Sequence, residues 1–127
     1  MQYLLLFNKD EAKFRALSEE ERARVRARYT EYGRRIVGTE IYLAGAALQP
    51  TETATTVRMR DGKRLITDGP FAETTEQIAG FALIDVPDLD TALEWAATHP
   101  DAEWASVEVR PVFHWAPSMS DVDDVMP

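Results

Sequence analysis

The chain has no cysteine among its 127 residues, and this absence removes several kinds of chemistry. Disulfide bonds, thiolate metal sites and cysteine nucleophiles are excluded. No apolar run approaches the ~20 residues that a membrane-spanning helix needs. The short apolar run from Tyr3 to Phe7 lacks the basic flank and the small-residue cleavage site of a signal peptide. We therefore expect a cytoplasmic protein without a membrane partner, in which this run forms a buried strand.

The motifs that mark common enzyme classes are also missing. The sequence contains no glycine-rich phosphate loop, no Gly-x-Ser-x-Gly elbow and no His-Glu-x-x-His motif. Its two histidines are poor metal ligands as a pair, and His99, which precedes Pro100, resembles a helix C-terminal residue favoured by the macrodipole. We therefore predict no metal and no cofactor.

The formal net charge of −8 argues against direct binding of nucleic acid. Arginines do gather between residues 22 and 35, behind the acidic residues 19–21. Acids at the start of a helix and bases toward its end suit the helix macrodipole, so a solvated helix face is the simplest interpretation. An anionic partner for the arginines is the alternative.

The order of predicted elements indicates the fold. Ser18 and Glu21 form a capping box that opens a helix over about 19–36. A second helix follows Pro87-Asp88, and Asp61-Gly62 marks the turn of a β-hairpin. With strands over 2–7, 41–48, 77–86 and 105–112, the order is βαββαβ with an inserted hairpin. This predicts an α+β, ferredoxin-like subunit over residues 1–115, followed by an acidic C-terminal tail over 116–127.

Two helices on one face of such a sheet leave the other face uncovered. In the fifth strand, Gly80 and Ala82 suit close helix packing, which places Phe81 and Leu83 on the open face. Arg110 of the last strand belongs to the side opposite Val107 and Val109. A face that mixes large apolar and charged groups fits a subunit interface with a polar pocket, so we predict a homodimer packed sheet to sheet.

The segment from Ala54 to Pro100, which contains "TDGPFAETTEQIAGFALIDV", followed by "SVEVRPV", closely resembles the YCII-related family, in the branch known for its Asp-Gly-Pro-Phe motif. The resemblance covers roughly residues 41–112. It implies a ferredoxin-like subunit in a dimeric α+β barrel. It also implies a gene neighbourhood that often holds an extracytoplasmic-function sigma factor.

The sequence departs from the family pattern at two positions. The resemblance implies a His–Asp active site with the histidine on the first helix, but residues 19–36 contain no histidine. The branch commonly has a glutamate in the second strand, where this chain has Ala46.

Asp68 of the Asp-Gly-Pro-Phe motif is the main candidate for a catalytic residue. In the structural interpretation, its side chain accepts a hydrogen bond from the backbone two residues on and stabilises the turn. In the functional interpretation, burial at the interface raises its pKa and makes it an acid or base. Glu73 could join it in a paired-carboxylate site. His114, at the end of the last strand, could replace the missing helix histidine.

Two functions remain open. In the first, a small-molecule binding protein or acid–base enzyme uses a pocket at the homodimer interface, where Arg58 and Arg110 orient an anionic or carbonyl-bearing ligand near Asp68, Glu73 and His114. In the second, the protein is a regulatory interaction module that binds a sigma-factor-type partner, for which its acidic balance is suited. A structural dimer without a ligand is a third possibility.

Overall fold

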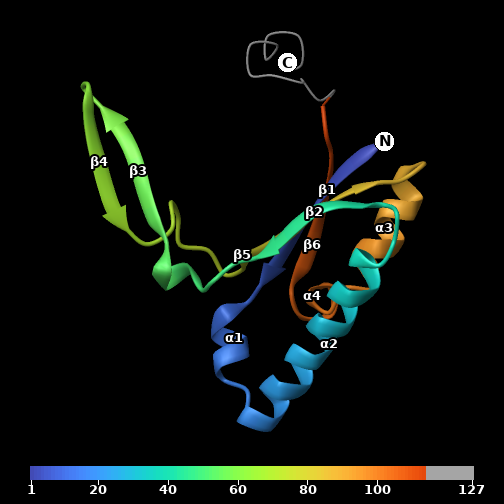
Figure 1. Ribbon diagram of the computed structural model, residues 1–127. Helices are drawn as coiled ribbons and strands as arrows, with labels where there is room; N and C mark the ends of the chain where they lie inside the picture. The colour runs from blue at the N-terminus through green and yellow to red at the C-terminus, as the bar shows by residue number, and fades with distance from the viewer. Residues whose placement is uncertain (114–127) are drawn as a thin grey trace.

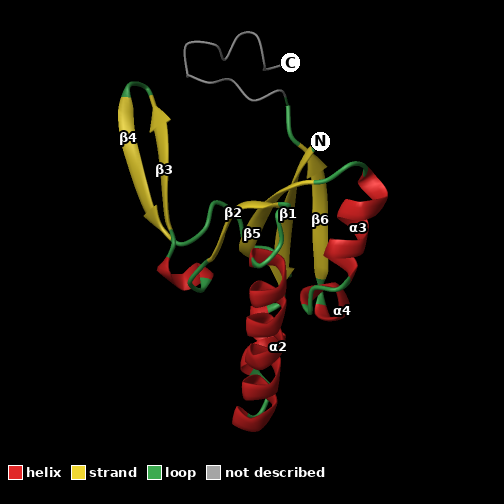
Figure 2. Cartoon of the chain, turned by 45° about the vertical axis from the view of Figure 1, so that its right-hand side comes forward, coloured by secondary structure: helices red, strands yellow, loops and turns green. Residues whose placement is uncertain are grey.

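The computed structural model describes residues 1–113, and its main body is a four-stranded antiparallel sheet with helices on one face (Figures 1 and 2). The strand order is β2-β5-β1-β6, which is the order of a ferredoxin-like fold, so the predicted fold class is confirmed. The elements in chain order are β1 (Gln2–Lys9), α1 (Glu11–Arg15), α2 (Glu19–Val37), β2 (Tyr42–Ala47), the 3-10 turn η1 (Thr51–Thr53), β3 (Thr55–Arg60), β4 (Lys63–Asp68), β5 (Gln77–Asp85), α3 (Leu89–Ala97), α4 (Asp101–Trp104) and β6 (Ser106–Pro111).

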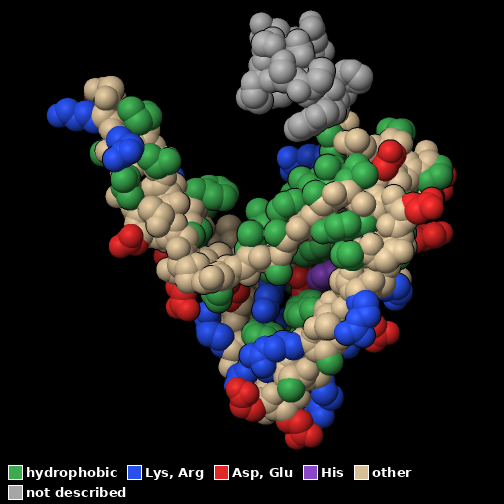
Figure 3. Space-filling model, in the orientation of Figure 1, with side chains coloured by type: hydrophobic (Ala, Val, Ile, Leu, Met, Phe, Trp, Pro, Cys, Tyr) green, Lys and Arg blue, Asp and Glu red, His purple; other side chains and the backbone are tan. Residues whose placement is uncertain are grey.

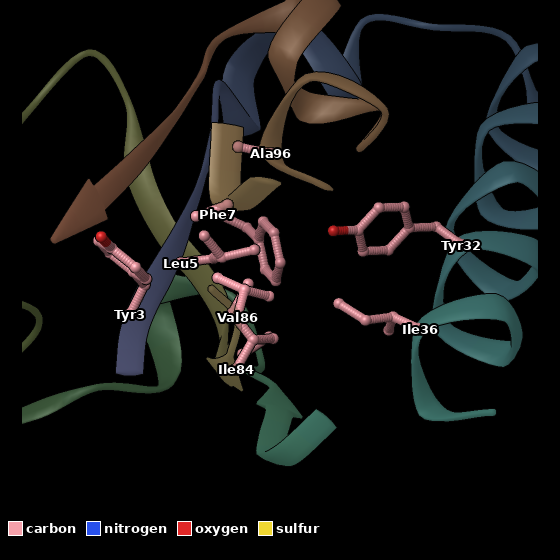
Figure 4. Close-up of a cluster of buried hydrophobic side chains, with 10 residues drawn as sticks. Tyr3, Leu5, Phe7, Tyr32, Ile36, Ile84, Val86 and Ala96 are labelled. Atoms are coloured by element: carbon pink, nitrogen blue, oxygen red, sulfur yellow. The ribbon is translucent and has the colours of Figure 1, made fainter. Parts of the chain in front are cut away.

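The core lies between the sheet and the helices. Leu5 of β1 and Ile84 of β5 are fully buried, and Tyr32 and Ile36 of α2 point toward them across the layer (Figure 4). Ala82 shares this side, whereas Phe81 and Leu83 are only partly buried. The predicted division of β5 into a helix-facing side and an open side is therefore confirmed.

Local sequence signals fix the ends of α2. The Ser18 side chain accepts the backbone N–H of Glu21, and the Glu21 carboxylate accepts the backbone N–H of Ser18. Gly38 caps the C-terminal end. No helix of the described residues is long and apolar enough to cross a membrane.

The apolar residues of α3 are buried only where they are small. Ala92 and Ala96 are buried, while Leu89 and Leu93 are nearly half exposed. The alanines let α3 lie close to the sheet, and the leucines then fall beside the contact rather than within it. The short elements α1, η1 and α4 were not predicted because each has one turn or little more, too few residues to show a helical period.

The inserted hairpin is an arm that projects away from the body, on the side opposite α2 (Figures 1 and 2). We use the term arm for β3, β4 and their turn. Asp61 and Gly62 form a two-residue turn in which both φ angles are positive, at 52° and 74°. This is the combination of a type I′ turn, so the Asp-Gly prediction of a hairpin is confirmed.

Replacing Gly80 with alanine is expected to lower the free energy of unfolding by about 1–3 kcal/mol. A Cβ at this position would lie 2.7 Å from the carbonyl oxygen of Ala46, so β2 and β5 would have to separate. Urea unfolding monitored by circular dichroism measures the change. Gly33→Ala is the matched control, because no atom lies within 4 Å of the added Cβ. Equal stability of wild type and Gly80→Ala would show that the strands absorb the clash.

Candidate functional site

A cavity of about 340 Å³ lies between α2 and the sheet. Small residues of β2 and β5 line much of its sheet side, together with the larger residues Phe7 of β1 and Tyr42 of β2. Figure 3 shows a hollow between the apolar surface of the sheet and the helices, with a histidine inside it beside acidic and basic side chains. The small residues on the sheet side are Gly45, Ala46, Ala47, Ala79 and Gly80, and α2 contributes Tyr29, Tyr32, Gly33 and Ile36.

His99 lines this cavity from the short connection between α3 and α4. Its ring is stacked on Phe7 of β1, with the ring centroids 3.9 Å apart and the planes at 11°. The backbone N–H of Asp101 donates to Nδ1 at 3.0 Å. Burial lowers the pKa of His99 to about 4, so the imidazole is neutral near neutral pH. Since Nδ1 accepts a hydrogen bond, the proton of the neutral ring is on Nε2.

The histidine is therefore not the macrodipole-stabilised residue that the sequence indicated. It does follow α3, but only 7% of its surface is exposed and its ring is held in the uncharged form. The prediction was wrong because it considered only the helix, whereas Phe7 and Tyr32 enclose the ring from other elements.

Asp101 is the second polar group of the cavity, and 1% of its surface is exposed. The hydroxyl of Tyr29 donates to Oδ1 at 2.5 Å. Burial raises the pKa of the Asp101 carboxyl, although the Tyr29 hydroxyl and the charge of Lys9 act in the opposite direction. The fold therefore keeps this carboxyl group away from bulk water and makes its charged form a better proton acceptor.

One atom of each group remains available to a ligand. Within the described residues, no group forms a hydrogen bond with Nε2 of His99 or with Oδ2 of Asp101, although Oδ2 lies 3.8 Å from Nδ1 of His99. Fully buried side-chain nitrogen and oxygen atoms without a partner are absent from the same residues. These two atoms are therefore not sealed in the interior, and since both residues line the cavity we assign the atoms to its wall.

Lys9 of β1 supplies a cation to the same cavity. Burial lowers the pKa of its ammonium group, and the nearby carboxylates of Asp101 and Glu11 partly oppose this effect. Its Nζ lies 3.6 Å from the centroid of the Phe14 ring, a cation–π geometry that anchors the side chain. No cluster of three or more metal-binding side chains occurs in residues 1–113.

The residues predicted as the site lie elsewhere. Arg58, Asp68 and Glu73 are exposed on the arm and the loop that follows it, whereas Arg110 is on β6 of the main sheet. The Arg58 guanidinium donates to the carbonyl of Phe71 at 3.1 Å, and Arg110 forms an ion pair with Glu108. His114 lies outside the described residues. One subunit does not bring the arm residues and Arg110 into one pocket, and a shared site between two subunits stays a prediction.

The Asp-Gly-Pro-Phe turn is held by backbone contacts rather than by its aspartate. The N–H of Gly69 donates to the carbonyl of Ala54 at 2.7 Å, and the Thr56 hydroxyl donates to the carbonyl of Gly69 at 2.8 Å. Within residues 1–113 the Asp68 carboxylate accepts no hydrogen bond. The expected bond from the residue two positions on cannot form, because that residue is Pro70 and has no N–H.

Comparison with known proteins agrees with the resemblance seen in the sequence. The sequence-family model of the YCII-related domain matches residues 1–116. The chain belongs to the YCII-related family. An uncharacterised protein of Rhizobium meliloti (strain 1021), R00369, is 39% identical over 119 residues, which cover 92% of this chain and 96% of the relative. Membership of the Asp-Gly-Pro-Phe branch remains a prediction from the motif itself.

The cavity contains a position at which this chain departs from the family pattern. Ala46, which stands where the branch commonly has glutamate, lines the cavity together with His99 and Asp101. The helix over residues 19–36 in which the family pattern has a histidine is α2, and in this YCII-related protein it provides Tyr29 and Gly33 to the cavity instead. A pairing of His99 with Asp101 two residues later could have been noticed in the sequence, but only the fold shows that both are buried.

Proposed function

We propose that this YCII-related protein binds a small organic molecule in the cavity under α2 and that Asp101 and His99 act on it as an acid–base pair. The observation that carries the proposal is the pair of free atoms, Nε2 of His99 and Oδ2 of Asp101, on residues otherwise buried. Buried titratable groups with perturbed pKa values in a cavity are candidates for a functional site.

The residues suit a ligand that carries a carbonyl or carboxylate group. Asp101, with its raised pKa, accepts a proton from the ligand. Nε2–H of the neutral His99 donates a hydrogen bond to a ligand oxygen, and the ammonium group of Lys9 compensates negative charge that develops there. The remaining wall is mostly apolar and aromatic, which favours a compact ligand with an apolar portion. His99 is then our candidate for the role of the histidine that α2 lacks.

Gly33 gives independent support. It lies in the interior of α2, where glycine costs the helix about 1 kcal/mol relative to alanine. Packing does not require it, because no atom lies within 4 Å of the Cβ that another residue would add. The residue lines the cavity, so its absent side chain leaves space for a ligand.

The test compares two substitutions at this position. Ligand-observed NMR with small aromatic and aliphatic carbonyl and carboxylate compounds identifies binders to the wild-type protein. Gly33→Leu fills the cavity with a residue of good helix propensity, and the affinity of these binders is expected to fall at least about tenfold. Gly33→Ala stabilises the helix equally but adds one methyl group, and it should keep most of the affinity. Binding that survives Gly33→Leu unchanged would place the ligand elsewhere and overturn the proposal.

A further inference from the structure

Lys9 differs from the other lysines of the chain. The sequence has three lysines, and Lys13 and Lys63 are exposed, whereas Lys9 is partly buried and lines the cavity under α2. Within residues 1–113 its ammonium group forms no hydrogen bond and no ion pair, and it rests on the face of the Phe14 ring instead. An ammonium group that is partly removed from water without gaining an acceptor is costly, so a role beyond packing is expected for it.

The surroundings of Lys9 favour its neutral amine form. Burial lowers the pKa of Lys9, and the charge of Arg26 acts in the same direction. The carboxylates of Asp101 and Glu11 oppose this effect without cancelling it. Removal from water and a neighbouring cation are the two conditions that turn a lysine nitrogen into a nucleophile toward carbonyl compounds. An arginine could not take this role, because its guanidinium group stays protonated.

Lys9 stands between the cavity and a small crevice. It lines the cavity of about 340 Å³ and also a crevice of about 10 Å³, to which Phe14, Val25 and Trp104 contribute. The crevice holds about one water molecule at most, so a ligand reaches Lys9 from the cavity. The Phe14 ring stabilises the ammonium form, and the flexible lysine side chain lets a neutral Nζ leave the ring and enter the cavity. Figure 3 shows the hollow from outside the molecule, so a small compound can enter it.

Asp101 is the group that can take the proton from Lys9. Both residues line the cavity, and the charge of each acts on the other. Among the described residues no ion pair locks the two groups together, so a ligand can interact with both. Glu11 is less suitable, because its carboxylate already accepts the backbone N–H and the hydroxyl of Thr51. Oδ2 of Asp101 accepts no such bond within residues 1–113.

We propose that Lys9 forms a Schiff base with an aldehyde or ketone bound in the cavity, and that Asp101 carries the proton that this step requires. The proposal rests on the proposed function of the cavity and deepens it, since it names the class of ligand and a covalent intermediate. In the proposed function Lys9 supplies only a positive charge. Here its nitrogen also forms a bond to the ligand.

The step conserves atoms and charge. The Asp101 carboxylate takes one proton from the Lys9 ammonium group. The Nζ lone pair then attacks the carbonyl carbon, and the electrons of the C=O π bond move to the oxygen, which accepts a hydrogen bond from Nε2–H of His99. A proton moves from nitrogen to oxygen and gives a neutral carbinolamine. Asp101 returns its proton to the hydroxyl group, which leaves as water while the C=N bond forms. The products are a protonated imine on Lys9, the Asp101 carboxylate and one water molecule.

The experiment traps the imine by reduction. The full-length wild-type protein is incubated near neutral pH with benzaldehyde, a compact aromatic aldehyde, and with sodium cyanoborohydride, which reduces the imine to a stable benzylamine. Tandem mass spectrometry then locates the label. We expect Lys9 to be labelled at least about tenfold faster than Lys13 and Lys63, which are exposed and serve as controls in the same sample. Labelling of Lys9 that is equal to or slower than theirs would overturn the proposal.

Asp101→Asn tests the proton carrier. We expect labelling of Lys9 to slow by about tenfold or more, because the amide cannot take up or return the proton. An electrostatic influence alone would act in the opposite direction. The Asp101 charge raises the pKa of Lys9, so its loss would increase the neutral amine and speed labelling. Asp90→Asn, on an exposed residue of α3, is the matched control and should label like the wild type. Faster labelling in Asp101→Asn would remove Asp101 from the step.

Gly33→Leu tests whether the aldehyde reaches Lys9 through the cavity. This variant should lower the labelling of Lys9 several-fold and leave Lys13 and Lys63 unchanged, whereas Gly33→Ala should keep most of the labelling. Labelling of Lys9 that is the same in Gly33→Leu would mean that the aldehyde arrives from outside the cavity, which would contradict the proposal.

The outcome also separates this proposal from the proposed function. Compounds that bind the wild type but not Gly33→Leu, together with a Lys9 that benzaldehyde does not label, would leave a cavity that binds its ligand without a covalent bond. The proposed function would then stand and the Schiff base would be overturned. A cavity that binds no compound and a Lys9 that is not labelled would overturn both.

Discussion

Lowering the pH from about 7 to about 4 is expected to reduce the free energy of unfolding by about 3 kcal/mol through His99 alone. Burial against Phe7 lowers the pKa of this imidazole from 6.5 to about 4 in the folded protein. The unfolded chain therefore binds a proton at a higher pH than the folded chain does. The stability is fully present above the unfolded pKa and is lost as the pH falls from about 6.5 toward about 4.

Urea unfolding at a series of pH values measures this loss, and His99→Gln is the control because glutamine does not titrate. The difference in unfolding free energy between the two proteins should shrink by about 3 kcal/mol over the window. Asp101 acts in the opposite direction, since its pKa is raised by burial, but it is common to both proteins. Parallel pH profiles for wild type and His99→Gln would mean that the imidazole is not held neutral by burial.

Replacing Asp101 with asparagine is expected to stabilise the protein near pH 7 while removing its chemistry. Burial disfavours the charged carboxylate, and the one hydrogen bond that it accepts within residues 1–113, from Tyr29, can be kept by an amide oxygen. The expected gain in unfolding free energy is about 0.5–2 kcal/mol, typical of relieving a functional group that is poorly suited to its surroundings. Any acid–base turnover should fall by about 100-fold or more.

Asp90→Asn is the matched control, because this aspartate is exposed near the start of α3. It should change neither turnover nor ligand affinity. Chemical unfolding gives the stability of each variant, and the binders found in the cavity test serve as substrates. If Asp101→Asn destabilised the protein and left ligand binding unchanged, the carboxylate would be a structural residue and the acid–base assignment would be wrong.

Much of the fold could be predicted from the sequence, because interactions between neighbouring residues determine it. The Ser18–Glu21 capping box and the Asp61-Gly62 turn each depend on neighbouring residues, and both formed as predicted. The alternation in β5 likewise placed Gly80 and Ala82 on the helix side, because successive side chains of a strand point to opposite faces.

The candidate site could not be predicted from neighbouring residues. It depends on Phe7, Tyr29 and His99, which come from three elements that only the packing of sheet and helices brings together. The same packing decides that His99 is neutral, which local sequence cannot show. The role of Asp68 in its turn, by contrast, could have been judged from sequence, since Pro70 has no N–H to donate.

The arm and the cavity under α2 are separate parts of the molecule, and we expect them to have separate roles. Asp68 and Arg58 lie on the exposed arm, where a homodimer interface stays a prediction from the sequence, whereas His99 and Asp101 belong to a cavity within one subunit. A sigma-factor-type partner remains a separate prediction from the resemblance.

The central claim is that a small molecule binds beside His99 in the cavity under α2. The most direct measurement is the ¹⁵N NMR spectrum of the His99 imidazole, recorded while a carbonyl-bearing binder is added to wild-type protein. We predict that the Nε2 signal shifts with binder concentration while Nδ1, held by the Asp101 backbone N–H, changes little. The shift should disappear in Gly33→Leu. Binding that leaves Nε2 unchanged and instead perturbs residues of the arm would contradict the account.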